Sequence, residues 1–593
     1  MMNPMKFLTT LLLILLMTCP PNRAQELTEA GAPADTAVHW QALGGVDGLG
    51  RVLPSHEEVG GLRQNRHVAM FYFLWHGDGT SPRQWDLSKI ISRHPEVLND
   101  FDNPNWGGGG MYYWAEPLYG YYRADDYWVH LRSMQLLTDA GVDLVVIDAT
   151  NRLIYAERAN VLMEAMEAIR AQGRQPPRIV FYTNTASGET MQRIYEQFYK
   201  EDAPYRHPAC WFYLDGKPLV IGHSAEAAGT DYADFFTIRE SQWPTEAQKV
   251  NGWPWISFQR PQRVHVNHRG EPEIINVSVA QHPNPTAGMG GSAFYGNKDN
   301  WGRSYRNGSA GNPVEDIIYG YNFQEQWDVA LRHEVPFVFV TGWNEWVAGK
   351  FPSHDDNPEH SWFCDQASPE YSRDIEPTRA AGIKDHYYMQ LVSNIRRYKG
   401  MPAVRPLDKP RTIRSLRDWG RVRALYRDYT RDTRPRKHPG AQSEPRTVYV
   451  DTTGRNDFDR LKVARDRDNV YFYAQTVDPV SPVGGSNWMR LYLDADRDPK
   501  SGWNGYDFRI SSGHRLEQYR EGAWVEIALL DYLVEQNEMM ITLPRKLVPS
   551  FAGTLNFEFK WSDNMQDEED PLDWYIHGDV APGGRFNFIV HEN

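Results

Sequence analysis

The sequence predicts an α/β protein, namely a (β/α)8 barrel of the TIM type followed by a C-terminal β-sandwich. Apolar strand-like runs alternate with helical stretches from residue 67 to about residue 400. Beyond residue 445, short alternating strands follow one another without helices. The chain has 593 residues, well beyond the ~250–300 residues at which a single core stops growing. We therefore expect at least two domains.

Each part of the predicted barrel rests on its own pattern. The runs at 67–75, 142–148, 178–184, 274–281 and 335–343 are almost continuously apolar, as is typical of parallel strands that are buried on both faces. Residues 126–140 and 155–172 carry apolar side chains at helical spacing. Residues 211–221 predict a hairpin around Asp215-Gly216. Because no glycine-rich phosphate loop follows the early strands, a barrel is favoured over a doubly wound sheet.

The C-terminal pattern predicts the β-sandwich. Strands are expected at 470–475, 488–493, 506–510 and 555–561, and strands at such spacing without helices are typical of a sandwich. The stretch from Gly400 to Pro445 is rich in Pro and Arg and marks a boundary. The predicted divisions are a signal peptide at 1–24, an N-terminal extension at 25–66, the catalytic barrel at 67–400, a linker at 401–411 and the β-sandwich at 412–593.

The charge balance and the aromatic content indicate which classes of binding partner to expect. Lys and Arg number 63 against 77 Asp and Glu, which gives a formal net charge of −14, so we expect no nucleic-acid partner. The basic stretch from Arg411 to Lys437 is interpreted as a solvated connector. Aromatic residues make up 13% of the chain, with 21 Trp. This excess predicts flat apolar surfaces for a ligand.

The N-terminus predicts export. Lys6 precedes a short apolar run at 7–17, and a polar exit leads to Ala24, which is the pattern of a signal peptide. The run is too short to span a bilayer, so no transmembrane span is expected. Cys19 follows a lipoprotein-like box, which leaves three locations open: periplasmic, secreted, or anchored to the outer membrane by a lipid. Cys210 and Cys364 either form one bridge or stay unpaired.

Polar residues of catalytic type follow three predicted strands. These strand ends are Asp148-Ala-Thr-Asn151, Tyr182-Thr-Asn184 and Gly342-Trp-Asn-Glu-Trp346. In a parallel barrel such residues collect at one mouth. A Glu345 enclosed by aromatic rings is expected to have a raised pKa, as a general acid needs. The alternatives are a rim salt bridge for Glu345 and turn or capping roles for Asp148 and Asn151.

The segment 342–349 resembles the Asn-Glu-Trp signature of glycoside hydrolase families 99 and 71, barrel enzymes that act on α-linked glycans. The Asp-Gly-Lys-Pro hairpin at 215–218 and the aromatic strand that ends in Trp75 add to the resemblance, which covers residues 67–400. The endo-α-mannosidase pattern has a second Glu three residues after the first, where this chain has Ala348. Either Glu345 keeps one catalytic role and another carboxylate supplies the second, or the resemblance is to a sister family with its own reaction.

The resemblance implies an exported glycoside hydrolase that cleaves a polysaccharide or oligosaccharide at α-linkages. Such cleavage needs two carboxyl groups. Glu345 is the first, and its expected partner is Asp148, followed by Asp374 and Glu376. Two other functions stay open, a surface glycan-binding protein without turnover and a polysaccharide lyase.

Aromatic and polar residues near these strand ends are the candidates for binding the sugar, since rings cover the apolar faces of pyranoses while amides and charges bind hydroxyl groups. The alternative for each single ring is a place in the core. The candidate substrate-binding residues are Trp75, Trp114, Glu116, Tyr122, Asn151, Tyr182, Asn184, His282, Arg303, Trp343, Asn344 and Trp346. Glu116 also ranks last among the candidate partners of Glu345.

The segment Arg490–Trp503 with Gly505–Phe508 resembles carbohydrate-binding module family 9. Asp494, Asp496 and Asp498 match the first half of an oxygen-rich calcium loop, although the Gly and the distal Glu of an EF-hand are missing. A structural calcium ion or a polar turn is expected there. Catalysis is expected to require no cofactor, since zinc-site spacings and nucleotide loops do not occur in the sequence.

Overall fold

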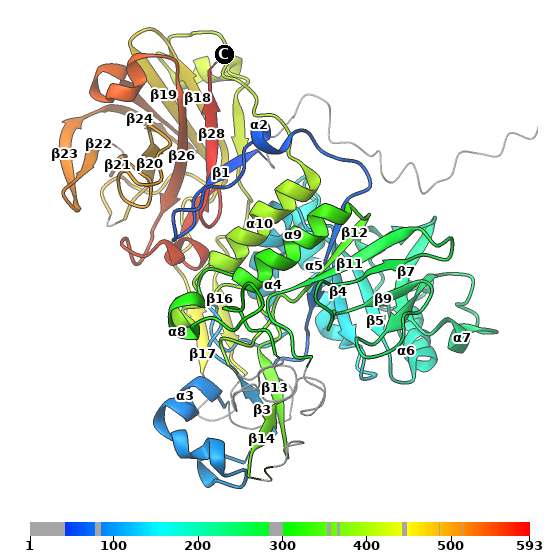
Figure 1. The fold of residues 1–593 in the computed structure, drawn as a ribbon. Coiled ribbons are helices and arrows are strands. Elements are labelled where there is room, and N and C mark those ends of the chain that lie inside the picture. The colour runs from blue at the N-terminus through cyan, green and yellow to red at the C-terminus, as the bar shows by residue number, and fades with distance from the viewer. Residues whose placement is uncertain are drawn as a thin grey trace, which may run out of the picture. The chain divides into compact units, whose positions relative to one another are not determined.

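A ten-stranded sheet, mostly parallel, forms the first half of the protein, and antiparallel sheets form the second (Figure 1). The computed structural model describes residues 42–77, 85–108, 110–283, 300–352, 357, 359–363, 368–441, 447–485, 487–512 and 514–592. The predicted signal peptide at 1–24, Cys19 and Cys364 lie outside these residues. The described residues belong to one compact unit.

The parallel strands of the first sheet follow one another in chain order, and the last pairs with the first. They are β2 (His67–Tyr72), β4 (Leu144–Ala149), β5 (Arg178–Thr183), β7 (Lys217–Gly222), β8 (Thr237–Gln242), β9 (Gly252–Pro254), β11 (Pro272–Ser278) and β12 (Phe337–Thr341). Strand β10 (Val264–Val266) pairs antiparallel with β11. The Asn251 N–H, next to β9, donates to the Val266 carbonyl at the end of β10 over 3.1 Å. The sheet is thus a nearly closed barrel.

Helices connect most of these strands, but not all of them. They are α4 (Tyr127–Ala140), α5 (Ala156–Arg170), α6 (Ser187–Ile194), α7 (Ser224–Ala227), α9 (Tyr321–His333) and α10 (His386–Lys399). Residues 243–251 join β8 to β9 without a helix, and β10 stands where the next helix would be. Nine residues that include Pro244 are too few for a helix with its two turns. The α/β barrel-like sheet is confirmed, while a regular (β/α)8 repeat is not.

Alternation of side chains explains why the strand sequences are continuously apolar. Phe71 and Val146 pack in the cluster of the barrel interior. Their neighbours Met70 and Ile147 belong to the cluster on the outer side. Both faces of the sheet are therefore covered, and all five predicted barrel strands are present in the structure.

Strand β8 escaped prediction because its buried residues are polar. Arg239 and Glu273 form a buried ion pair at 2.7 Å, and Ser241 and Gln242 are also buried. The predicted hairpin is confirmed: β6 (Tyr213–Leu214) pairs with β7, and the turn residues Asp215 and Gly216 have φ of 53° and 80°.

The second half consists mainly of two antiparallel sheets. One sheet contains β1 (Leu43–Gly45), β20 (Arg490–Asp494), β21 (Phe508–Ser511), β22 (Arg515–Arg520), β23 (Ala523–Leu529), β26 (Asn556–Asp563), β27 (Asp579–Ala581) and β28 (Phe586–His591). The other contains β15 (Leu425–Arg427), β18 (Phe458–Arg465), β19 (Asn469–Thr476), β24 (Asp531–Glu535) and β25 (Glu538–Pro544). The Phe472 ring lies 6.0 Å from those of Phe557 and Phe559, so apolar rings fill the space between the sheets.

The N-terminal segment contributes to the C-terminal sheet, because β1 pairs with β28 (Figure 1). Shorter elements complete the fold: α2 (His56–Val59), α3 (Leu87–Arg93), β3 (Met111–Tyr113), α8 (Pro313–Asp316), β13 (Val347–Pro352), β14 (Ser361–Phe363), β16 (Arg436–Pro439) and β17 (Val448–Asp451). Across the part of the chain that the structure describes, no helix combines the length and the apolar character that a membrane span requires.

Candidate active site

Glu345 lies just beyond the carboxyl end of β12, in the segment 342–346 that leads into β13. Its side chain is only 3% exposed, and its Oε2 atom lies 2.5 Å from Nη2 of Arg373. The guanidinium charge favours the ionised carboxylate. An ionised Glu345 suits a base or a nucleophile, two of the roles predicted for Glu345 besides that of a general acid.

The segment 372–376 holds the Glu345 segment in place through its backbone. Gly342 N–H donates to the Arg373 carbonyl at 2.9 Å, and Glu376 N–H donates to the Trp343 carbonyl at 3.0 Å. The carboxylate of Asp374 accepts the backbone N–H of Glu345 and the indole N–H of Trp114. Burial raises the pKa of Asp374 to about 7. Asp374 therefore positions Glu345.

Glu376 lies in the same segment and is fully enclosed. Its Oε2 atom accepts hydrogen bonds from the Tyr122 hydroxyl at 2.8 Å and from the indole N–H of Trp346, while Oε1 has no hydrogen-bond partner among the described residues. Burial raises the pKa of Glu376 to about 8. This carboxyl group is consequently protonated at neutral pH.

The enclosed Glu376 should make stability depend on pH. The folded protein keeps a proton that an unfolded Glu releases near its ordinary pKa of 4.5, so the free energy of unfolding falls as the pH rises from 4.5 to about 8. In Glu376→Gln we expect the free energy of unfolding to fall less steeply between these pH values. Asp374, whose pKa is also raised, accounts for part of the remaining pH dependence. Urea unfolding at several pH values measures it, with the exposed Glu189→Gln as control. An unchanged slope would contradict the assignment.

Asn344 links the segment that follows β12 to the segment that follows its neighbouring strand β2. Its Oδ1 atom accepts the Phe73 N–H at 2.9 Å, and its Nδ2 atom donates to the Phe73 carbonyl at 3.2 Å and to the Tyr122 hydroxyl at 3.2 Å. Phe73 directly follows β2. Asn344 thus fixes the position of its neighbour Glu345 relative to the first strand.

Three of the predicted sugar-binding tryptophans do not offer an open ring. Trp114, Trp343 and Trp346 are each 0% exposed, and the rings of Trp114 and Trp346 stack at 4.6 Å. The indole groups of Trp114 and Trp346 instead donate to the buried carboxyl groups of Asp374 and Glu376, and the Trp343 ring lies 6.1 Å from that of Tyr388. The predicted platform role is corrected to a core role for these rings.

Tyr122 and Arg303 are enclosed as well. Tyr122 is 2% exposed and bonds to Glu376. Arg303 is 0% exposed, and its Nη2 atom donates to the Asp374 carbonyl at 2.7 Å and to the Ser372 hydroxyl at 2.8 Å. Both residues therefore support the segment 372–376 and present no surface to a ligand.

Asp148 ends β4 at the same edge of the sheet and is 6% exposed. Its Oδ1 atom accepts the Thr150 N–H at 3.0 Å and the Thr150 hydroxyl at 2.7 Å, which is the predicted turn contact. Asp148 thus shapes the loop, and its role as the second carboxylate of the mouth stays a prediction.

The other predicted binding residues are spread over several places. Asn151 is exposed, and the Asn184 amide oxygen accepts the Ser241 hydroxyl at 2.9 Å. The Tyr182 hydroxyl donates to the Trp253 carbonyl at 2.8 Å inside the barrel. Glu116 is 46% exposed and pairs with Lys89 at 2.7 Å. Tyr182 therefore belongs to the barrel interior and Glu116 to the surface.

His282 and the missed residue His76 are buried and neutral. Burial lowers the pKa of each to about 3, and the charge of Arg373 contributes for His282. Neither ring nitrogen of either residue has a hydrogen-bond partner among the described residues. His76 belongs to no apolar pattern of the sequence, so spacing alone did not single it out.

The sequence also gave no sign that Arg373 pairs with Glu345. Two further residues, Trp255 and Trp243, were not predicted as part of the site. The Arg373 guanidinium lies 4.8 Å from the centre of the Trp255 ring. Trp243 follows β8, is half-buried and lines a pocket with Gln242 and Pro254. Trp75, which was predicted, is half-buried beside Phe73. Trp75 and Trp243 both follow strand ends and keep some exposure.

The predicted calcium loop brings together a partly different set of carboxylates. Ligand atoms of Asp494, Asp496 and Asp507 lie within 4.8 Å of one another. Asp498 is not in this group, and its Oδ1 atom accepts the Lys500 N–H at 3.0 Å. Asp507 replaces Asp498 because β21 returns beside β20 in the antiparallel sheet.

Comparisons with known proteins found similarity at the level of solved structures only. No protein-family model and no curated protein matches the chain. Two structures of the glycoside hydrolase family 99 (GH99) endo-alpha-mannosidase from Bacteroides thetaiotaomicron match, one of them in complex with BIS-TRIS-propane. The complex is 13% identical with a TM-score of 0.31, and the other structure is 12% identical with a TM-score of 0.32. Each match covers 56% of this chain and 97% of the other. Similarity of this degree does not assign the chain to a family.

Proposed function

We propose that the protein is an exported glycoside hydrolase that cleaves a polysaccharide or oligosaccharide at α-linkages. The observation that carries the proposal is Glu345, a buried carboxylate just beyond the last parallel strand, paired with Arg373 and fixed through its own backbone by Asp374. Catalytic groups of barrel enzymes stand at this edge of the sheet. Glu345 acts as nucleophile or base.

Asp148 is the proposed partner and supplies the acid. Only β2 lies between β4 and β12, so two strand spacings of ~4.8 Å separate their backbones by ~10 Å. The carboxyl groups of glycosidases stand ~5–9.5 Å apart, a separation that side chains from these two strand ends can span. The half-buried rings of Trp75 and Trp243 would hold the sugar.

A glycan-binding protein without turnover is the second candidate. It is favoured by the Arg373 charge, which already neutralises Glu345, and by Ala348 in place of a second Glu. Incubation of the unmodified protein with a panel of α-linked glycans separates the two functions. We expect new reducing ends, whereas retention of a glycan without product would support the binding protein. An unsaturated product that absorbs ultraviolet light would identify a lyase.

We also propose that the C-terminal sheets form an accessory carbohydrate-binding sandwich with a calcium ion at Asp494, Asp496 and Asp507. Burial, with repulsion from Glu558, raises the pKa of Asp494 to about 8, and a bound cation would relieve this repulsion. Calcium is expected to raise the melting temperature of the unmodified protein more than that of Asp507→Asn. Equal shifts in both proteins would contradict the site.

A further inference from the structure

We propose a second calcium site, built from Asp432, Asp457 and Asp579 with Asp428 beside them, where the C-terminal sheets meet helix α4. Asp428 and Asp432 follow β15, Asp457 precedes β18 and Asp579 begins β27. Three separate segments of the chain thus deliver carboxylates to one place. The site is distinct from the group at Asp494.

The spacing of the oxygen atoms fits calcium. One ligand atom from each of Asp432, Asp457 and Asp579 lies within 4.8 Å of the other two. Oxygens that share a calcium ion at ~2.4 Å lie within ~4.8 Å of each other. The three ligand atoms therefore lie within the span that one calcium ion can bridge.

The hydrogen bonds leave an oxygen available on most of these carboxylates. Gln135 donates to Oδ2 of Asp432 at 3.0 Å, and the Arg431 N–H donates to Oδ2 of Asp457 at 2.7 Å. The other oxygens, Oδ1 of Asp432 and Oδ1 of Asp457, are buried without a hydrogen-bond partner among the described residues. In Asp432 and Asp457 a hydrogen bond thus holds one carboxylate oxygen and leaves the other for a ligand. Hydrogen bonds from outer partners orient metal-binding carboxylates in this way.

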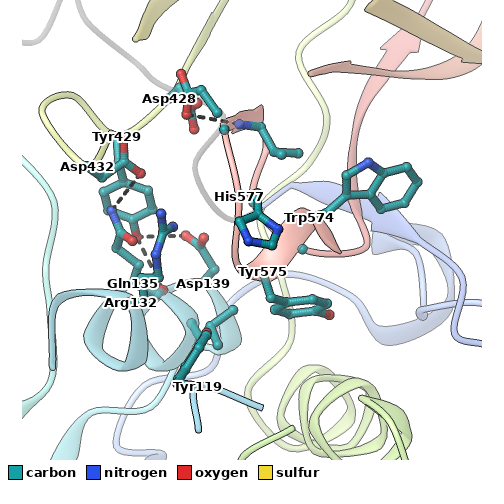
Figure 2. Close-up of a pocket in the computed structure, with 16 residues that line it drawn as sticks. Tyr119, Arg132, Gln135, Asp139, Asp428, Tyr429, Asp432, Trp574, Tyr575 and His577 are labelled. Atoms are coloured by element: carbon teal, nitrogen blue, oxygen red, sulfur yellow. Dashed lines mark hydrogen bonds between the residues drawn. The ribbon is translucent and has the colours of Figure 1, made fainter. Parts of the chain in front are cut away.

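Asp428 gives an independent indication of a ligand. It is 4% exposed, and its Oδ2 atom has no hydrogen-bond partner within the described ranges. It lines the same pocket as Asp432 and Asp579. Figure 2 shows Asp428 and Asp432 in this pocket, with Gln135 bonded to Asp432 from α4. A buried carboxylate without a partner is costly unless a cation compensates it.

The nearby cations are engaged elsewhere. Arg174 pairs with Asp139 at 3.2 Å, Lys560 donates to the Pro582 carbonyl, and the Arg132 guanidinium lies 4.1 Å from the Trp128 ring. Among the residues that the structure describes, no Lys or Arg lies within 4.0 Å of the four carboxylates as an ion-pair partner. No ion pair with a described Lys or Arg thus compensates these carboxylates.

Calorimetric titration with CaCl2 tests the site on the full chain after chelator treatment. We expect Asp457→Asn and Asp432→Asn to lose one of the calcium equivalents that the unmodified protein binds, or to bind it roughly ten- to hundredfold more weakly. Asp459→Asn is the matched control, because Asp459 lies two residues away and pairs with Arg460 at 3.2 Å. Its titration should equal that of the unmodified protein.

Asp457→Asn and Asp432→Asn are both used, so that one variant still tests the site if the other does not fold. Circular dichroism shows whether each variant is folded. Asp507→Asn identifies the calcium equivalent that binds at Asp494, Asp496 and Asp507. The proposal for that site and the proposal for the second site can therefore fail independently. The second site is overturned if Asp457→Asn and Asp432→Asn bind calcium as the unmodified protein does, or if the unmodified protein binds none.

Discussion

Replacing Glu345 by Gln is expected to lower kcat on the identified glycan by ~10²–10⁴-fold, the contribution of a positioned acid or base. Gln keeps the size of the side chain and can still accept a hydrogen bond from Arg373, which lies 2.5 Å from the carboxylate. It removes the charge that, in the proposed function, attacks the sugar or activates water. The rate of release of reducing ends measures the effect, together with KM.

The control for this variant is Glu334→Gln, because Glu334 is 74% exposed just beyond α9. It should keep the activity of the unmodified protein. Asp148→Asn should lose activity to a comparable extent if Asp148 is the second carboxyl group. Full hydrolysis by Glu345→Gln would show that the catalytic assignment is wrong, whereas a loss confined to KM would point to a binding role.

The second large effect is on stability. Arg373→Met is expected to destabilise the fold by ~3–5 kcal/mol, because it leaves the buried carboxylate of Glu345 without its partner. The side chains of this pair are 1% and 3% exposed. In contrast, Arg152→Met breaks an exposed pair with Glu189, of which the side chains are 54% and 73% exposed, and should cost ~1 kcal/mol or less. Urea unfolding at pH 7 compares the two variants.

A double variant separates the charge from the shape of Arg373. Arg373→Met combined with Glu345→Gln should recover part of the lost stability, since no unpaired charge then remains in the enclosure. If the single variant is as stable as the unmodified protein, the ion pair is not the buried contact that it appears in the structure. If the two substitutions are simply additive, the pair has no coupling energy.

The sequence predicted best those elements whose residues are buried on both faces. The runs that became β2, β4, β5, β11 and β12 are apolar throughout, because neighbours on both sides of the sheet exclude water from them. The hairpin turn at Asp215-Gly216 could be predicted from local sequence, because both turn residues adopt positive φ, which an Asp-Gly pair favours. Strand β8 could not be predicted in this way, because it buries the charged Arg239, which pairs with Glu273 from another strand.

The candidate site divides in the same way. The apolar runs alone predicted that Asp148 stands at the end of one parallel strand and that Glu345 follows another. The pairing of Arg373 with Glu345, and the indoles of Trp114 and Trp346 that face Asp374 and Glu376, became visible only in the folded chain. Periodicity along one segment reports whether a side chain is buried, whereas the partner that compensates a buried charge comes from a distant segment and is set by the closure of the sheet.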